Sequence, residues 1–394
     1  MYTTCEILCL KIEAKRMNKT INGREKSESG GIALPRGLSF SAVRNSPVEI
    51  HVPLCYNAAE LTATHSGGGK RRPCVLEMLK AILFLLAGFV LLIKGADFFV
   101  DGSSSVARRL KVPSLIIGLT IVALGTSLPE LSVSITASLA NSNALAVSNV
   151  IGSNIFNLMV VLGASALMNT VTVSGDVTKR DFPFSVLCAV LLLVLGCLNM
   201  ELGRLDGILF LVIFAGFLVY QITTALAARK TALAEAAEKE EDSRPEIPMW
   251  LSLIYIVGGA AAVRFGGDWV VNSARTIAAF FGLSENMIGL TIVAMGTSLP
   301  ELVTSVMAAK KKELDMAVGN VVGSNIFNIL MILGVASALS PIGFIMENVI
   351  DIAVLLGFSL LVWVFCAVRK KLGKAEGAGM LLLYCAYTVY ICLR

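Results

Sequence analysis

The sequence has few charged residues and almost no histidine. Only 15% of its 394 residues are charged, whereas 56% are hydrophobic, a composition that excludes an ordinary soluble globular protein. Both histidines, His51 and His65, precede the long apolar segments, so no imidazole can bind a metal or act as a base within them. The nine cysteines form no CxxC pair, and no GxSxG motif is present. A histidine-based metal site within the apolar segments is therefore excluded, and the sequence fits a serine hydrolase poorly.

Long apolar runs take up most of the chain. They are about 17–25 residues long, the length that crosses a bilayer, and short polar breaks separate them. We expect an all-α polytopic membrane protein with ten transmembrane helices, at about 78–100, 114–139, 145–169, 183–199, 205–228, 248–271, 285–309, 316–340, 349–368 and 378–393. The basic residues lie in the breaks and not in one patch, so the net charge of +5 does not indicate nucleic acid as a partner.

Residues 1–77 differ from the rest of the chain. They are polar and mixed, with no sustained period of 2 or 3.6, and they lack the pattern of a signal peptide. We expect this segment to be disordered or loosely structured. An alternative interpretation is that the natural protein starts at or near Met78, where the first span begins, and that residues 1–77 are not part of it.

Two pairs of near-identical motifs divide the apolar part into halves. GLTIVALGTSLPEL (Gly118–Leu131) returns as GLTIVAMGTSLPEL (Gly289–Leu302), and NVIGSNIFN (Asn149–Asn157) returns as NVVGSNIFN (Asn320–Asn328), both at an offset of 171 residues. We predict two five-helix repeats, 78–228 and 248–394, joined by a charged linker at 229–247. Because five is odd, the second repeat enters the membrane from the opposite side, and such inverted repeats place the substrate site between them near the midplane.

The loop charges predict an orientation. The loops 101–113, 170–182, 229–247, 310–315 and 369–377 contain sixteen Lys or Arg residues, whereas the opposite loops and the C-terminus contain only Arg204, Arg275 and Arg394. Positive charge marks the cytoplasmic side. We therefore expect the linker in the cytoplasm and both ends of the ten-helix part outside.

The first motif pair offers oxygen ligands beside a helix break. Pro129 cannot donate a main-chain hydrogen bond, so it frees a carbonyl group, and Glu130 places a carboxylate three residues after Ser127 on the same helix face. A carboxylate within a membrane segment indicates a functional site. The candidate residues of this motif are Thr126, Ser127 and Glu130, and in the second copy Ala294, Thr297, Ser298 and Glu301.

The second motif pair adds hydroxyl and amide groups. Ser153 and Asn157 share a helix face, as do Ser324 and Asn328, and Gly152 and Gly323 predict close helix packing. All of these ligands are hard oxygens, which suit Na⁺, Ca²⁺ or Mg²⁺ and not zinc or copper.

Structural interpretations of the same residues remain open. A hydroxyl such as that of Thr126 or Ser153 often bonds to the carbonyl four residues earlier in its own helix. Asp97 and Asp268, also related by the offset, lie near span ends, where contacts at a helix end or with a loop are a simpler explanation than ion ligation.

Together, the paired GTSLPE and GSNIFN motifs resemble those of the sodium/calcium exchanger family, in its prokaryotic ten-span form. The resemblance covers about residues 78–393. It implies side-chain ligands at Thr126, Ser127, Glu130, Ser153, Thr297, Ser298, Glu301 and Ser324, backbone carbonyl ligands at Ala123 and Ala294, and a polar contact at Asn157. Many members are acidic at the position of Asn328, so this chain has two carboxylates where those members have three.

The resemblance implies a secondary active antiporter that exchanges Ca²⁺ for Na⁺ by alternating access, and not an enzyme. The alternatives are a Ca²⁺/H⁺ antiporter, an uncoupled cation channel and a non-transporting ion-binding membrane protein. We expect no cofactor besides the transported ions, with K⁺ or H⁺ as further candidates, and lipid as the surrounding partner. We also expect a functional monomer in the plasma membrane, which is the inner membrane in a prokaryote.

Overall fold

The computed structural model describes residues 75–139, 143–235, 247–281 and 294–393. The predicted extension, 1–77, lies outside the described residues except for Val75–Glu77, which belong to a helix. Most of the predicted linker 229–247 lies outside them too, as does the first part of the second GLTIVAMGTSLPEL motif.

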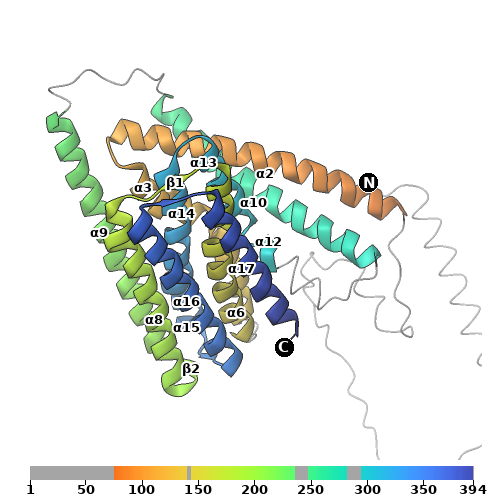
Figure 1. Ribbon diagram of the computed structural model, residues 1–394. Helices are drawn as coiled ribbons and strands as arrows, with labels where there is room; N and C mark the ends of the chain where they lie inside the picture. Colours follow the sequence, from red (N-terminus) through yellow and green to blue (C-terminus); the bar gives the residue numbers. More distant parts are fainter. Residues whose placement is uncertain (1–74, 140–142, 236–246, 282–293, 394) are drawn as a thin grey trace, which may run out of the picture. The chain divides into compact units, whose positions relative to one another are not determined.

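The described residues are almost entirely helical (Figure 1). In the first half the helices are α2 (Val75–Leu110), α3 (Ser114–Ile117), η1 (Gly118–Val122), α4 (Ala123–Thr126), α5 (Leu128–Leu139), α6 (Asn143–Phe156), η2 (Asn157–Val161), α7 (Leu162–Met168), η3 (Val177–Asp181), α8 (Phe182–Asn199) and α9 (Arg204–Glu235), where η marks a π-helical stretch. In the second half they are α10 (Met249–Phe280), α12 (Ala294–Gly296), α13 (Leu299–Lys310), α14 (Leu314–Phe327), η5 (Asn328–Leu333), α15 (Gly334–Leu339), α16 (Met346–Arg369) and α17 (Lys374–Leu393).

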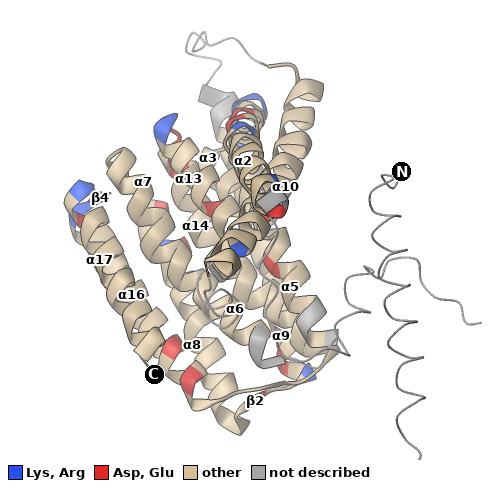
Figure 2. Cartoon of the chain, turned by 90° about the vertical axis from the view of Figure 1, so that its right-hand side faces the viewer, with Lys and Arg blue, Asp and Glu red and all other residues tan. Residues whose placement is uncertain are grey.

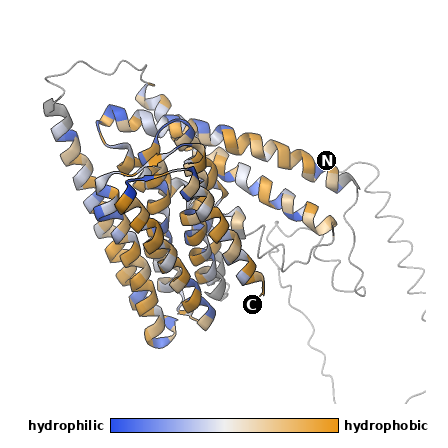
Figure 3. Ribbon diagram, viewed as in Figure 1, coloured by the Kyte–Doolittle hydropathy of each residue, from blue (hydrophilic) through white to orange (hydrophobic). Residues whose placement is uncertain are grey.

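The lengths and compositions of these helices fit a membrane. Within the described part of the chain, eight helical segments are long and apolar enough to cross a bilayer, and a ninth span is bent by 46° between α4 and α5. The one remaining predicted span, 285–309, which is the seventh in chain order, begins in residues that are not described and continues as α12 and α13. Figure 2 shows most charged residues near helix ends, and Figure 3 shows hydrophobic residues along α8, α9, α16 and α17.

Three of the predicted spans end earlier than the helices in the structure. The first continues to Leu110 instead of residue 100, the fifth to Glu235 instead of 228, and the sixth to Phe280 instead of 271. In the first span, the serines at 103–105 resemble a loop, but all three are buried, and Ser105 Oγ accepts a hydrogen bond from Ser252 Oγ at 3.0 Å. Polar residues that pack against another helix do not end their own helix.

Helices α2 and α10 form a closely packed antiparallel pair. Glycines on α2 recur every seven residues, at 88, 95 and 102, and they meet Gly266, Gly259 and Ser252 of α10 in that order. A Cβ atom at Gly95 would lie 2.8 Å from the Val263 nitrogen, so only glycine allows this approach. A helix of 36 residues is about 54 Å long, which exceeds the thickness of the hydrocarbon layer, and Figure 1 shows the pair inclined to α8 and α9.

Two short sheets connect the halves. The strands are β1 (Val171–Thr172), which pairs antiparallel with β4 (Lys371–Leu372), and β2 (Glu201–Leu202), which pairs antiparallel with β3 (Ile342–Gly343). Val171 faces Leu372 in one sheet, and Ile342 faces Leu202 in the other. Val171 and Ile342 are 171 residues apart, and their partners Leu372 and Leu202 are 170 apart. Exchanging the two halves therefore converts one sheet into the other.

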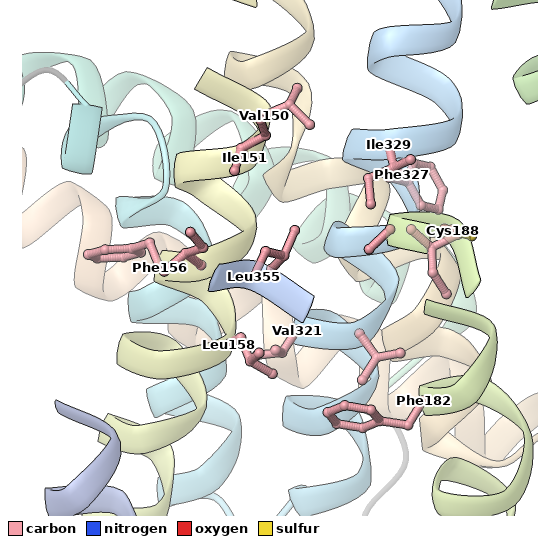
Figure 4. Packing of buried hydrophobic residues seen from close by; sticks show 14 of the residues in the cluster. Val150, Ile151, Phe156, Leu158, Phe182, Cys188, Val321, Phe327, Ile329 and Leu355 are labelled. Atoms are coloured by element: carbon pink, nitrogen blue, oxygen red, sulfur yellow. The ribbon is translucent and has the colours of Figure 1, made fainter. Parts of the chain in front are cut away.

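The centre of the fold consists of the two helical segments that carry the GSNIFN motifs. In Ala146–Met168 and Leu314–Leu339, 78% and 83% of the most apolar window is buried, whereas in each of the six other unbroken spans at most 33% is. Their own hydrophobic residues, such as Val150 and Val321, share one core with residues of the surrounding helices, such as Phe182, Cys188 and Leu355 (Figure 4). These two segments are therefore enclosed by protein on most sides, and their polar residues do not face lipid.

Candidate ion-binding site

Each GTSLPE motif breaks its helix at the serine. Ser127 has φ −84° and ψ 8°, and Ser298 has φ −95° and ψ 9°, so neither residue continues the α-helix before it. Pro129 and Pro300 follow in the first turn of α5 and α13, where proline is tolerated because that N–H would have no helical partner. The break places Glu130 and Glu301 in the first turn of a new helix, where the helix dipole stabilises a negative charge.

The two carboxylates are paired with serines of the opposite repeat. Ser127 Oγ donates to Glu301 Oε1 at 3.0 Å, and Ser298 Oγ donates to Glu130 Oε1 at 3.1 Å. Both glutamates are fully buried. The spacing in the sequence predicts that Ser127 and Glu130 lie together on one face of one helix. In the structure, each serine instead bonds to the glutamate of the other repeat. The site is thus shared equally by the two halves.

Several buried oxygen atoms near the middle of the motifs have no hydrogen-bond partner among the described residues. They are Oε2 of Glu130 and of Glu301, Oγ of Ser153 and of Ser324, and Oδ1 of Asn157 and of Asn328. Burying a polar atom without a partner is costly, and such atoms are rare in folded proteins. Carboxylate, hydroxyl and amide oxygens are ligands of hard cations, so this set is chemically suited to Na⁺ or Ca²⁺.

No salt bridge within the described part of the chain balances the charges of the two glutamates. Neither Glu130 nor Glu301 forms a salt bridge with any described residue, and the same part of the chain contains no group of three or more His, Cys, Asp or Glu side chains placed to hold a metal. The candidate site therefore combines two carboxylates with neutral oxygens. Two buried negative charges without a salt-bridge partner are expensive in a low-dielectric interior, which favours a bound cation.

The two predicted asparagines lie at local changes of helix geometry. Asn157 begins η2 and Asn328 begins η5, and π-helical turns often occur at functional sites. The two side chains differ in their contacts. Asn328 Nδ2 donates to Asn154 Oδ1 at 2.9 Å, whereas neither side-chain atom of Asn157 has a partner among the described residues. The repeats are therefore not equivalent at this position.

Thr126 bonds to its own helix, as the structural interpretation expects. Its Oγ1 lies 3.2 Å from Val122 O, 3.3 Å from Ala123 O and 3.2 Å from Asn320 Oδ1. The predicted carbonyl at Ala123 also accepts the main-chain N–H of Ser127 at 3.0 Å. In the second copy, Ala294 begins α12 and Thr297 lies in the turn before α13.

The predicted glycine contact is present in the second GSNIFN motif. A Cβ atom at Gly323 would lie 2.8 Å from Leu119 O, so α14 packs directly on η1. For Gly152, no described atom lies within 4 Å of that position; the segment related to η1 by the repeat, 289–293, is outside the described residues.

Other polar residues of the site were missed by the sequence analysis. Asn154 and Asn325 join the two GSNIFN helices to each other. Asn320 Nδ2 donates to Ser305 Oγ at 2.8 Å, which links α14 to α13. The sequence does mark Asn154, Asn320 and Asn325, because these positions are asparagine in both copies of NVxGSNIFN. Their contacts could not be predicted, because they depend on how the helices cross.

Comparisons with known proteins find relatives that match most of this chain. Residues 80–223 and 251–393 match the family of sodium/calcium exchanger proteins. The chain is 36% identical to the inner membrane protein YrbG of Escherichia coli, over 77% of this chain and 94% of that protein. It is 31% identical to the sodium/calcium exchanger MaX1 of Methanosarcina acetivorans, over 78% of this chain and 97% of that one. Among solved structures, it is similar to the sodium-calcium exchanger NCX_Mj soaked with Na⁺ and Sr²⁺, with a TM-score of 0.69 and 33% identity over 80% of this chain and 99% of that one.

These matches confirm the resemblance that the paired motifs indicate. They also confirm the predicted fold class, an all-α multi-pass membrane protein with ten helices in two inverted repeats. The matched family consists of exchangers, which move ions across membranes, so the expectation that the chain is not an enzyme is confirmed as well.

Proposed function

The chain belongs to the sodium/calcium exchanger family, and on this premise we propose that it is a secondary active antiporter that exchanges cytoplasmic Ca²⁺ for external Na⁺. The observation that carries the proposal is the crossed pair of hydrogen bonds, Ser127 to Glu301 and Ser298 to Glu130. It joins two buried carboxylates from opposite repeats and leaves the second oxygen of each without a partner among the described residues.

In this proposal the ions bind between the broken helices and the GSNIFN helices. The ligands are the carboxylates of Glu130 and Glu301, the hydroxyls of Thr126, Ser127, Ser153, Thr297, Ser298 and Ser324, the carbonyls of Ala123 and Ala294, and the amide oxygens of Asn157 and Asn328. Ser127 and Ser298 each hold one oxygen of a glutamate, which orients the other oxygen toward an ion. No resident cofactor takes part.

The formal charge of the site suggests the stoichiometry. Two carboxylates balance one Ca²⁺ or two Na⁺, whereas a third Na⁺ leaves one charge uncompensated in a low-dielectric site. Because the opposing ions then carry equal charge, exchange is electroneutral. Alternating access requires that the loaded site opens to one side at a time, and no covalent chemistry is involved.

The proposal includes an orientation and a location. Strand β4 lies in the loop 369–377, which is rich in Lys and Arg. Figure 2 shows basic residues gathered chiefly at the end of the bundle that carries this strand. By the positive-inside rule this end is cytoplasmic, so both ends of the ten-helix part lie outside. The protein acts as a monomer surrounded by lipid in the plasma membrane, the inner membrane of a prokaryote.

Ion fluxes in vesicles test the proposal. The purified protein is reconstituted, and Ca²⁺ uptake is measured under an imposed gradient of Na⁺, K⁺ or H⁺ in turn. We expect uptake driven by the Na⁺ gradient. Uptake driven by the H⁺ gradient alone identifies a Ca²⁺/H⁺ antiporter, and uptake that is independent of all three gradients identifies a channel. Ion binding without flux identifies a non-transporting protein. Each of these results overturns the proposal.

Substitutions of the two carboxylates complete the test. Glu130→Gln and Glu301→Gln each keep the shape of the side chain and remove half of the formal charge, so each should reduce Ca²⁺ uptake to background while the protein still inserts and folds. Glu347→Gln is the control, because Glu347 is exposed in the first turn of α16. Near-normal exchange by either site variant contradicts the two-carboxylate site.

A further inference from the structure

A cavity lies beside the carboxylate site, between α10 and the two broken helices. Its volume is about 170 Å³, and its lining includes Pro129, Thr297 and Pro300 of the GTSLPE motifs and Arg264, Asp268 and Asn272 of α10. Pro129 and Pro300 directly precede Glu130 and Glu301 in the chain. The cavity therefore ends at the prolines beside the two buried glutamates, which do not themselves belong to its lining.

The charged groups in this lining form an ion pair. Arg264 and Asp268 lie one turn apart on α10, and the Arg264 guanidinium contacts the Asp268 carboxylate. Their side chains are 32% and 42% exposed. The sequence suggests a helix-end or loop contact for Asp268, but its partner is a residue of its own helix. Among the described residues, this ion pair consequently does not tie α10 to another helix.

The related position in the first repeat is arranged differently. Asp97, the counterpart of Asp268, and Asp101, the counterpart of Asn272, both contact Lys311 at 2.6 Å. Lys311 follows α13, so these contacts tie α2 to the adjoining helix. The Phe99 ring is buried and packs on Gly125, where a Cβ atom would lie 2.9 Å from the ring. Gly296, the counterpart of Gly125, is also closely packed, because a Cβ atom there would clash with a methyl group of Val271. The two sides therefore differ in the Lys311 cross-link near Asp97 and in the cavity beside Asp268.

We propose that the cavity is the entrance to the cation site from the side of Asp268, and that Asp268 is the first carboxylate an entering cation meets. Arg264 neutralises this carboxylate, and a divalent cation competes with the guanidinium for it before passing to Glu130 and Glu301. The inference rests on the proposed exchange of cations at those two glutamates. A fixed positive charge in a narrow entrance repels cations, and a free carboxylate there concentrates them, so the pair sets the apparent affinity for Ca²⁺ on this side.

Transport kinetics give the first test. In the proposed orientation α10 runs outward from the cytoplasmic linker, so Asp268 lies in its outer half. In right-side-out vesicles, Arg264→Gln should lower the KM for external Ca²⁺ about 3- to 10-fold and leave kcat within about twofold, because Asp268 is then free. Asp268→Asn leaves the arginine unneutralised and should raise this KM about 10-fold. The increase should shrink at high salt, since the screening length falls from about 10 Å at 0.1 M to about 3 Å at 1 M. The double variant should return close to the parent value.

Lys94→Gln is the matched control for the kinetics. Lys94 is an exposed residue of α2 outside the lining, and its substitution removes the same charge as Arg264→Gln. Equal effects of Lys94→Gln and Arg264→Gln, an unchanged KM in both entrance variants, or shifts of the same sign in Arg264→Gln and Asp268→Asn would overturn the assignment.

A second readout does not depend on transport. In a background without the nine native cysteines, Asn272→Cys places a thiol in the cavity, and its reaction rates with a cationic and an anionic methanethiosulfonate are compared. Arg264→Gln should shift the ratio several-fold toward the cationic reagent, and Asp268→Asn should shift it toward the anionic one. These shifts in a protein that moves no Ca²⁺ would support the charged entrance while refuting the proposed function. An unlabelled thiol, or one ratio in all backgrounds, overturns the inference whatever the transport result.

Discussion

Asn154 and Asn325 exchange hydrogen bonds between the two repeats. The side-chain Nδ2 of each donates to the main-chain oxygen of the other at 3.3 Å, and the two residues are separated by the same 171 positions as the motifs that contain them. Both side chains are buried. This reciprocal contact joins the two central helices at equivalent points, so it fixes how the halves of the ion site face each other.

Substitutions of these asparagines should have unequal effects. Asn154→Ala removes the hydrogen bond to Asn325 and also the acceptor of Asn328 Nδ2, whereas Asn325→Ala removes one side-chain hydrogen bond. With about 0.5–1.5 kcal/mol for each lost bond, we expect Asn154→Ala to lower the stability about twice as much as Asn325→Ala. Thermal unfolding in detergent measures the order. Asn199→Ala, at the exposed end of α8, is the control, and a larger loss for Asn325→Ala would contradict the contact between Asn154 and Asn328.

Much of this architecture could be predicted from the sequence because the repeat is explicit. The offset of 171 residues, applied to GTSLPE and GSNIFN, identifies Glu130, Glu301 and the serines before them without any structure. The pairing of Ser127 with Glu301 could not be predicted, because spacing along one helix does not say how it crosses another. The end of α2 could not be predicted either, because the serines at 103–105 are buried against other parts of the protein and Ser105 bonds to Ile247 O and Ser252 Oγ, which lie far away in the chain.

The packing of α2 on α10 should tolerate no side chain at Gly259. A Cβ atom there would lie 2.7 Å from the Phe99 nitrogen and 2.8 Å from Gly95 O, and main-chain atoms cannot move aside easily. Gly259→Ala should therefore destabilise the protein by about 1–3 kcal/mol, as overpacking does, and slow ion exchange. Thermal unfolding and initial rates of Ca²⁺ uptake measure the two effects.

Gly258→Ala is the matched control for this substitution. Gly258 is the preceding residue of α10, is exposed, and has no described atom within 4 Å of its Cβ position. Because alanine is the better helix former by about 1 kcal/mol, this variant should be as stable as the parent or slightly more stable. Equal losses of stability in Gly258→Ala and Gly259→Ala would show that the close contact of Gly259 with α2 does not matter.

Lys311 should contribute to stability through α2. Its Nζ lies 2.6 Å from Asp97 Oδ1, 2.6 Å from Asp101 Oδ1 and 2.9 Å from Asp97 O. The three groups are partly exposed, so each ion pair contributes about 1 kcal/mol or less. Lys311→Met should lower the thermal midpoint in low salt and less so in high salt. Lys310→Met, at the exposed neighbouring position, should not, and equal midpoints for the two variants would mean that these ion pairs are not formed in solution.

An additional carboxylate should make the exchange voltage-dependent. Asn157→Asp and Asn328→Asp each add a third negative charge, which balances a third Na⁺, so exchange against one Ca²⁺ then moves one net charge. We expect the parent protein to show Ca²⁺ uptake independent of membrane potential, and both variants to respond to a K⁺ diffusion potential set with valinomycin. Asn328→Asp should also lose stability in ion-free buffer, because a carboxylate cannot donate to Asn154 Oδ1 as Asn328 Nδ2 does. Asn157 has no such bond among the described residues, so its variant should lose less. Potential-independent uptake in both variants would show that neither asparagine contributes to the charge of the ion site.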